Sequence, residues 1–258
     1  MMQSLQRGFR VLELLVQHSA PITLGELSRT AGLPAASTYR IVQSLIELGY
    51  ATKVAGGRYQ HGSKVLELAG QVLTSMDYAV HSRPVLLQLQ AHTEETIHFG
   101  ILAGDHAQYV DKLESRAAYR VASVVGMRVD LHCTAIGKAI LAFLPEADRE
   151  RHLAPEKLVA KTPKTITSRN GLLFELARVR SSGYCLDDEE DREGIRCVGA
   201  PVFDHRGDAI GGISVSGPVF SFSLAAATAL ATDVIQAARE VSQSLGAPAA
   251  AFPEAYRD

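Results

Sequence analysis

In the first part of the chain, apolar residues recur at the spacing of short helices. They stand at every third or fourth position between residues 5 and 16, and Pro21 ends this run. Such spacing places apolar side chains on one face of a helix. Thr23 and Glu26 then match a capping box, in which two side chains bond the free backbone N–H groups of a helix start. The pattern therefore predicts one helix before Pro21 and a short second helix that ends at Ala31.

A third helix is predicted after Pro34, because proline favours the first turn of a helix and the apolar spacing continues beyond it. Residues 50–54 and 58–60 then have the pattern of two short strands. Gly56 and Gly57 lie between them and accept the positive φ angles of a tight hairpin. Three helices followed by a hairpin are the elements of a winged helix-turn-helix.

Farther along, the pattern predicts a linker helix and a larger mixed domain. Gly62 and Ser63 mark a boundary, and residues 64–76 are amphipathic with helical spacing. Residues 96–102 and 107–113 alternate like the two strands of a hairpin. The remaining predicted elements are a helix over 79–92, strands at 119–125, 195–203 and 209–217, and helices near 136–143, 168–182 and 223–245.

Strand hairpins interleaved with helices favour an α+β fold with an antiparallel sheet over a doubly wound parallel sheet. A chain of 258 residues has room for one small and one medium domain. We expect a winged helix-turn-helix over residues 1–62, a linker helix over 63–78 and a second domain over 79–258.

Composition is that of an ordinary globular protein, with 47% apolar and 21% charged residues. No stretch approaches the ~20 uninterrupted apolar residues of a membrane span, and the N-terminus lacks a signal-peptide cleavage site. Three cysteines, Cys133, Cys185 and Cys197, are too few for the disulfide framework of a secreted protein. We therefore expect a cytoplasmic protein with no membrane partner.

Charge is distributed unevenly along the chain. Residues 1–60 hold six basic and three acidic side chains, a net charge of +3, although the whole chain carries −2. The remainder therefore carries −5. A basic N-terminal part on an acidic body is the asymmetry expected when only that part meets nucleic-acid phosphates.

Candidate DNA contacts lie on the second and third helices and on the hairpin. They are Arg29, Ala36, Ser37, Tyr39, Arg40, Gln43, Lys53 and Arg58. On the third helix these side chains stand opposite Val42 and Leu45, which point inward. Arginine can pair with guanine, glutamine with adenine, and hydroxyl groups with phosphate. A three-helix domain that contacts another protein is the alternative.

The second domain contains no complete phosphate-loop or zinc motif. Residues 131–139 look like a phosphate loop at a glance, but the glycine spacing is wrong and Ala139 stands where Ser or Thr must follow Lys138. What remains is a loop entering a helix, whose free N–H groups suit an anion. No CxxC or HxxxH pair is present. We therefore predict no cofactor, no metal site and no catalytic residue.

Two other interpretations of this domain stay open. A small-molecule enzyme that uses Cys133 or Cys197, with an accessory N-terminal domain, is the alternative to a regulator. The acidic run at residues 187–191 is either a solvated loop or a site for a hard cation.

Ser214 and Ser216 alternate with Ile213 and Val215, so both hydroxyl groups share one face of a strand. Two inward hydroxyl groups need hydrogen-bond partners, which favours a polar cavity. A solvent-exposed face would explain the alternation equally well.

Three stretches resemble the IclR family of bacterial transcriptional regulators. Residues 22–69 are similar to its winged helix-turn-helix and linker, and DLHCTAIGKAILA at 130–142 is similar to its loop-helix segment. Residues 183–218, which run from GYCLDD to SVSGP, resemble its long C-terminal signature. TEETIHFG, YVDKL and LHCTAIGK are most similar to the branch that responds to ketodeoxygluconate and related sugar acids, although these features are widely shared.

The resemblance implies a GAF-like effector-binding domain over residues 79–258, dimers built through the DNA-binding half and often tetramers. It also implies where the effector binds. Carried over position by position, the pocket residues are Ala135, Ile136, Asp187, Ile195, Cys197, Ser214 and Ser216. The resemblance therefore favours a ligand cavity, rather than a solvent-exposed face, as the explanation for Ser214 and Ser216.

One departure from the family concerns the third helix. Many relatives carry Lys-Ser where this chain has Ala35-Ala36, so an operator sequence cannot be transferred from them.

The expected partners are double-stranded operator DNA, a small organic or sugar acid as effector, and further copies of the chain in a homodimer or homotetramer.

Overall fold

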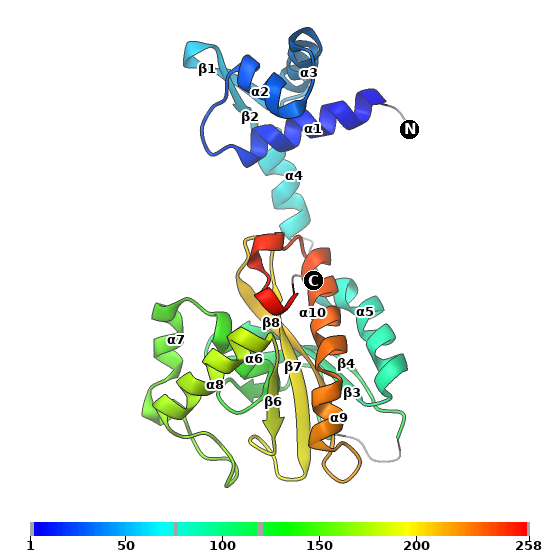
Figure 1. Ribbon diagram of the computed structural model, residues 1–258, viewed down its shortest axis with the longest axis vertical. Helices are drawn as coiled ribbons and strands as arrows, with labels where there is room; N and C mark the ends of the chain where they lie inside the picture. Colours follow the sequence, from blue (N-terminus) through cyan, green and yellow to red (C-terminus); the bar gives the residue numbers. More distant parts are fainter. Residues whose placement is uncertain (1–2, 75–76, 118–120, 257–258) are drawn as a thin grey trace. The chain divides into compact units, whose positions relative to one another are not determined.

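The structure is a computed structural model that describes residues 3–74, 77–117 and 121–256. The chain forms two compact units, Met1–Met76 and Asp77–Asp258. Figure 1 labels most of their helices and strands, numbered in chain order. The predicted domain limits at residues 62 and 78 stay predictions.

The N-terminal unit contains three helices, a small hairpin and a fourth helix. These are α1 (Gln3–Gln17), α2 (Leu24–Ala31), α3 (Ala35–Glu47), β1 (Ala51–Val54), β2 (Arg58–His61) and α4 (Ser63–Thr74). The capping box is present, since the Thr23 side chain accepts from Glu26 N and the Glu26 carboxylate accepts from Thr23 N. Gly56 and Gly57 both have positive φ in the hairpin turn, as their sequence predicts.

A compact core holds the three helices and the hairpin together. Val11, Leu27 and Val42, one from each helix, are fully buried, and Tyr59 of β2 packs with them. The apolar residues at the outer end of α1 do not join this core, because Leu5 and Phe9 are 57% and 56% exposed. An apolar stripe on α1 is therefore left without cover inside the unit.

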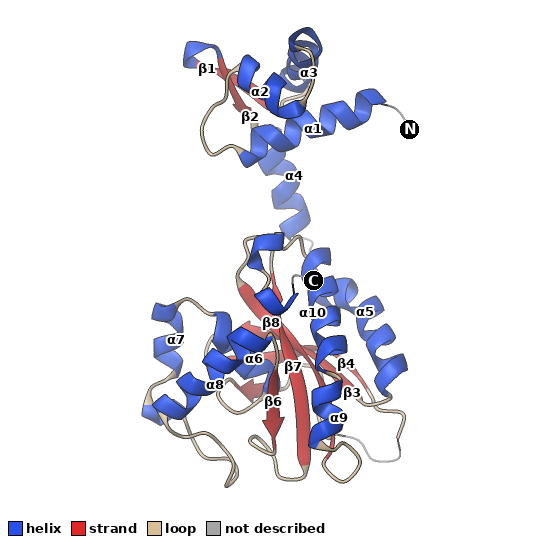
Figure 2. Cartoon of the chain, viewed as in Figure 1, coloured by secondary structure: helices blue, strands red, loops and turns tan. Residues whose placement is uncertain are grey.

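The C-terminal unit is built on six antiparallel strands in the order β5-β4-β3-β8-β7-β6 (Figure 2). The strands are β3 (Thr96–Ala103), β4 (His106–Leu113), β5 (Arg128–Asp130), β6 (Cys185–Asp188), β7 (Ile195–Phe203) and β8 (Ala209–Pro218). The predicted α+β fold with an antiparallel sheet is confirmed.

Helices cover both faces of this sheet. Helices α5 (Tyr78–Thr93) and α10 (Ala231–Ser244) pack together on one face, and α6 (Ala135–Phe143) and α8 (Arg169–Ser182) on the other (Figure 1). Two shorter helices are α7 (Glu146–His152) and α9 (Leu224–Ala229). The helix predicted over 223–245 is thus divided in two.

The strand predicted at 119–125 is wrong over its described part, and residues 119–120 lie outside the described residues. Residues 121–125 form a loop, because the carbonyl groups of Val121 and Ser123 accept hydrogen bonds from Lys112 Nζ instead of a neighbouring strand. The edge strand is β5, which pairs with β4. Sequence reasoning also missed β6 and α7.

Candidate nucleic-acid interface and effector cavity

One side of α3 is exposed and carries the predicted DNA contacts. Thr38 and Val42 are buried against α1 and α2, which turns the opposite side of the helix outward. Tyr39 is 46% exposed, and Arg40 is also exposed. Ala36 completes the exposed set, and Ser37 and Gln43 lie partly buried beside it.

The basic side chains around this surface differ in how they are held. Arg29 and Lys53 are exposed. Arg58 Nη1 donates to the carbonyl oxygen of Pro21 at 3.1 Å and lies 4.0 Å from the Glu26 carboxylate, so it fixes the hairpin to the loop before α2. Arg40 has no hydrogen bond or ion pair within residues 3–74, which leaves its guanidinium available.

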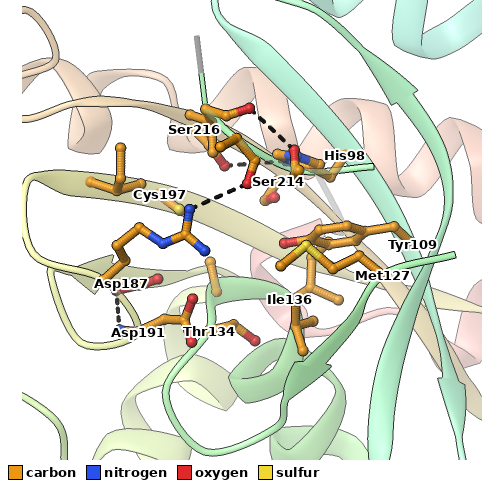
Figure 3. A pocket seen from close by; sticks show the side chains of 17 residues that line it. His98, Tyr109, Met127, Thr134, Ile136, Asp187, Asp191, Cys197, Ser214 and Ser216 are labelled. Atoms are coloured by element: carbon orange, nitrogen blue, oxygen red, sulfur yellow. Dashed lines mark hydrogen bonds between the residues drawn. The ribbon is translucent and has the colours of Figure 1, made fainter. Parts of the chain in front are cut away.

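A cavity in the C-terminal unit is lined by all seven residues predicted to contact the effector (Figure 3). Its side chains leave about 40 Å³ of free space. Further residues around it are His98, Tyr109, Val121, Ala122, Ser123, Met127, Val129, Thr134, Asp191 and Arg192. In Figure 3, Ser214, Ser216 and His98 gather on one side, and Thr134 and Asp191 lie across from them.

Helix α6 starts at this cavity. Thr134 caps it, since its Oγ1 accepts a hydrogen bond from Gly137 N at 3.1 Å. The N–H groups of Ala135 and Ile136 have no acceptor among the residues that the structure describes. A Cβ on Gly137 would lie 2.4 Å from Leu131 Cα, so only glycine lets the helix begin this close to the preceding loop. Two backbone donors therefore remain at the cavity wall.

The serine pair on β8 points into the cavity. Ser214 and Ser216 are only 3% and 2% exposed, so the solvent-exposed alternative is wrong. Ser216 Oγ lies 3.4 Å from His98 Nδ1, and His98 Nε2 lies 2.7 Å from Ser123 Oγ. Burial lowers the pKa of His98 to about 3, so its ring is neutral. The Ser216 hydroxyl group thus belongs to a polar chain inside the protein.

His98 and Tyr109 were missed by sequence reasoning. They sit on neighbouring strands β3 and β4, and their rings stack with centroids 4.4 Å apart. The available signal was strand pairing, because His98 lies directly opposite Ser214 in the β3–β8 register. That register is not readable from one strand alone.

Asp187 stands at the end of β6 and organises the turn into β7. Its Oδ1 accepts hydrogen bonds from Glu190 N at 2.7 Å and Asp191 N at 3.4 Å. Burial raises the pKa of this carboxyl to about 7. The group is therefore partly protonated near neutral pH and can donate as well as accept a hydrogen bond.

The rest of the acidic run is tied down by basic side chains. Glu190 accepts a hydrogen bond from Lys138 Nζ at 2.5 Å, and the same ammonium group reaches Glu175 of α8 and the carbonyl oxygen of Leu186. Lys138 is fully buried. Asp188 pairs with Lys164 and Arg196. The interpretation of residues 187–191 as a solvated acidic loop is therefore wrong for Asp187 and Glu190, which are buried, whereas the other three acidic residues are partly exposed.

Cys133 and Cys185 are buried, and Cys197 is partly buried. Burial raises the pKa of Cys133, of Cys197 and, to about 12, of Cys185. A neutral thiol is a poor nucleophile, so the geometry gives no support to cysteine catalysis. Donor atoms of Cys133, Asp130 and Asp191 lie within 4.8 Å of one another, but Asp130 is already paired with Lys161.

No helix in the described ranges combines the length and apolar character needed to cross a bilayer.

Two family models match the chain. Residues 70–243 match "Bacterial transcriptional regulator IclR C-terminal", and residues 4–55 match "IclR helix-turn-helix domain".

Individual relatives match over nearly the whole chain. HTH-type transcriptional regulator XynR of Escherichia coli is 32% identical over 96% of this chain and 98% of its own length. HTH-type transcriptional regulator KdgR of the same organism is 34% identical over 94% of this chain and 92% of its own. The identities to these two relatives, 32% and 34%, are too similar to each other to assign the chain to one branch of the family.

Among solved structures, the repressor BlcR of Agrobacterium tumefaciens superposes with a TM-score of 0.77 at 27% identity. The superposition covers 95% of this chain and 97% of that one. The fold resemblance therefore includes both units rather than one of them.

Proposed function

Because the chain belongs to the IclR family of bacterial transcriptional regulators, we propose that a small carboxylate in the cavity controls how α3 reads operator DNA. The protein is a DNA-binding transcriptional regulator with an effector-binding domain. Regulators of this family are not enzymes, so the alternative of an enzyme using Cys133 or Cys197 is set aside.

DNA contact is assigned to the exposed side of α3 and to the hairpin. Arg40 and Gln43 reach base edges in the major groove, where arginine and glutamine make bidentate pairs. Lys53 and Arg29 meet phosphate, which positions the helix without reading sequence. Ala36, Ser37 and Tyr39 complete the contact surface, and Arg58 supports it by holding the hairpin.

Effector binding rests on one observation, the convergence of the seven predicted residues on a single cavity. The N–H groups at the start of α6 suit the carboxylate of a ligand. Ser214 and Ser216 donate to its oxygen atoms, and Asp187 bonds a hydroxyl group. Ile136 and Ile195 supply apolar walls. An organic or sugar acid with at least one hydroxyl or keto group fits these requirements.

Control of DNA binding requires two copies of the chain. A dimer presents paired α3 helices, which must sit about 34 Å or a multiple apart to read a palindrome. An effector shifts the spacing of these helices only if it binds one arrangement more tightly than the other. A homodimer, or a homotetramer made of two, is the proposed assembly.

The test begins with genomic fragments captured by the full-length protein, followed by a screen for acids that alter binding to the captured operator. Ser214→Ala combined with Ser216→Ala should leave DNA affinity without acid unchanged. The acid concentration needed for a response should rise about tenfold or more, because two hydrogen bonds are lost.

Ser181→Ala is the matched control, since Ser181 is an exposed residue of α8 outside the cavity. A double variant that responds to the acid like the wild type would contradict the assignment of the cavity.

A further inference from the structure

Arg192 closes one side of the effector cavity. It lies in the turn between β6 and β7, and its side chain is exposed. Its Nη1 donates a hydrogen bond to the carbonyl oxygen of Ala122 at 3.2 Å, although the two residues are 70 positions apart in the chain. Both residues line the cavity. The contact therefore bridges the mouth at its solvent side.

The charges around the cavity are unbalanced without Arg192. Among the described lining residues it carries the only permanent positive charge, and the acidic ones are Asp187 and Asp191. His98 does not help, because its ring is neutral. Arg192 forms no ion pair with a carboxylate in the described parts of the chain, and bonds a backbone carbonyl instead. A guanidinium at this mouth is thus available to an incoming anion.

The opposite side of the mouth is firmly held. Ser123 Oγ lies 2.7 Å from His98 Nε2, and the Ser123 carbonyl oxygen accepts from Lys112 Nζ at 2.6 Å. The Val121 carbonyl oxygen accepts from the same ammonium group. Arg192, by contrast, has a single hydrogen bond at the surface. When the mouth opens, Arg192 is the part that moves at the lowest cost.

The cavity must open to admit an organic acid. The free space of about 40 Å³ is well below the roughly 150 Å³ of a cavity that holds a six-membered ring, so a sugar acid or aromatic acid does not fit unless the cavity opens. Releasing the Arg192–Ala122 hydrogen bond removes one wall without breaking the core. A guanidinium–carboxylate pair is stronger than its bond to a neutral carbonyl, so a bound acid compensates for the release.

We propose that Arg192 is the counter-ion that selects an acid as effector: its guanidinium leaves the Ala122 carbonyl, admits the ligand and then pairs with the same carboxylate that the N–H groups at the start of α6 bind. This inference rests on the proposed function of the cavity as the effector site. Without Arg192, a carboxylate in the cavity would meet only Asp187 and Asp191 as charged neighbours. The arginine thus makes the site prefer an acid over the neutral amide of the same shape.

The experiment compares acids with their own primary amides on the full-length protein. The probes are lactate with lactamide, gluconate with gluconamide, and 4-hydroxybenzoate with 4-hydroxybenzamide, followed by calorimetric titration and by the shift in melting temperature. The variants are Arg192→Gln, which removes the charge, and Arg192→Lys, which keeps it. Arg151→Gln is the control, because Arg151 is a highly exposed arginine of α7 outside the cavity.

The wild type should bind one of the acids at least about tenfold more tightly than its amide. Arg192→Gln should abolish this preference by weakening the acid alone. Arg192→Lys should retain most of it, and Arg151→Gln all of it.

An unchanged acid-to-amide ratio in Arg192→Gln overturns the inference. If the double serine variant then weakens acid binding about tenfold or more, the cavity remains the effector site and only the role of Arg192 is wrong. If neither variant alters acid binding, the acid binds elsewhere and the proposed function also fails. Failure of every acid to bind the wild type at millimolar concentration overturns the choice of a carboxylate, and this inference with it.

Discussion

Asp187 accepts two backbone hydrogen bonds that shape the turn between β6 and β7, yet its carboxyl group is buried beside the cavity. Burial outweighs these hydrogen bonds, and the pKa rises from its usual value of 3.8 to about 7. The folded state therefore holds a proton on Asp187 that the unfolded state has already released between about pH 4 and pH 7. In that range the wild type loses stability as the pH rises, and the full cost is present above about pH 7.

Asp187→Asn should remove this pH dependence. The amide oxygen still accepts both backbone hydrogen bonds, but the position no longer ionises. The free energy of unfolding of the variant, relative to the wild type, should increase by about 2–4 kcal/mol between pH 4 and pH 8. Chemical denaturation at several pH values measures it.

Asp188→Asn is a control of opposite sign. Partial burial raises the pKa of Asp188, but hydrogen bonds and charges from Lys164 and Arg196 outweigh burial, so the pKa lies below its usual value. This carboxylate stabilises the fold above its unfolded pKa, and Asp188→Asn should therefore be less stable than the wild type at neutral pH.

The prediction for Asp187 is contradicted if the free energies of unfolding of Asp187→Asn and the wild type change with pH in parallel. Asp187 would then not be protonated in the folded protein.

At the scale of elements, local signals in the sequence predicted the N-terminal unit well. The Thr23–Glu26 capping box and the paired glycines of the hairpin act through neighbouring backbone, so a single sequence contains the information. The loop at 121–127 is different. Its course depends on Lys112 of another strand, which takes the backbone carbonyl groups that a strand would have paired.

The cavity was predictable where one strand or one helix start carries the pattern, as for Ser214 and Ser216 on β8. His98, Tyr109 and Arg192 were not found, since each enters the site through strand register or a long-range contact. The family resemblance gave the remaining pocket residues, but Arg192 is not among the positions that it assigns to the pocket. Prediction from sequence therefore ended where contacts between distant segments began.

Helix α3 should lose sequence-specific binding when Arg40 is truncated. Arg40→Ala should cost about 1–3 kcal/mol on the operator, because a bidentate base contact disappears. Fluorescence anisotropy with operator and scrambled duplexes measures the difference. Lys53→Ala is the comparison, since loss of a phosphate contact should weaken both duplexes alike and lower the salt dependence. Unchanged operator affinity in Arg40→Ala would exclude Arg40 from the interface.

At the scale of the whole molecule, exposed apolar side chains point to self-association. Leu5, Phe9 and Val16 form a stripe along α1, and Leu66 and Leu68 are exposed on α4. A single helix-turn-helix offers a small interface with DNA, and two-fold symmetry lets a second copy double it. Covering the α1 stripe removes apolar surface from water, which drives association.

Phe9→Glu should convert the proposed dimer to a monomer and reduce operator affinity, because it places a charge in the proposed contact. Light scattering at micromolar concentration reports the mass. Phe174→Glu is the matched control, since Phe174 is an exposed phenylalanine of α8 in the other unit. A wild-type protein that stays monomeric both with and without DNA would contradict the proposal.

The buried Lys138 has a consequence for how such a regulator can evolve. Its ammonium group joins α6, α8 and the turn after β6, so replacing Lys138 leaves the buried Glu190 carboxylate without its cation, at a cost of about 3–5 kcal/mol. Lys138 and Glu190 can therefore change only together. Arg192 has one hydrogen bond at the surface, and a single mutation can exchange it without loss of the fold. A lineage can thus acquire a new effector through mutations at Arg192, at the mouth of the cavity, while the buried ion pair of Lys138 stays unchanged.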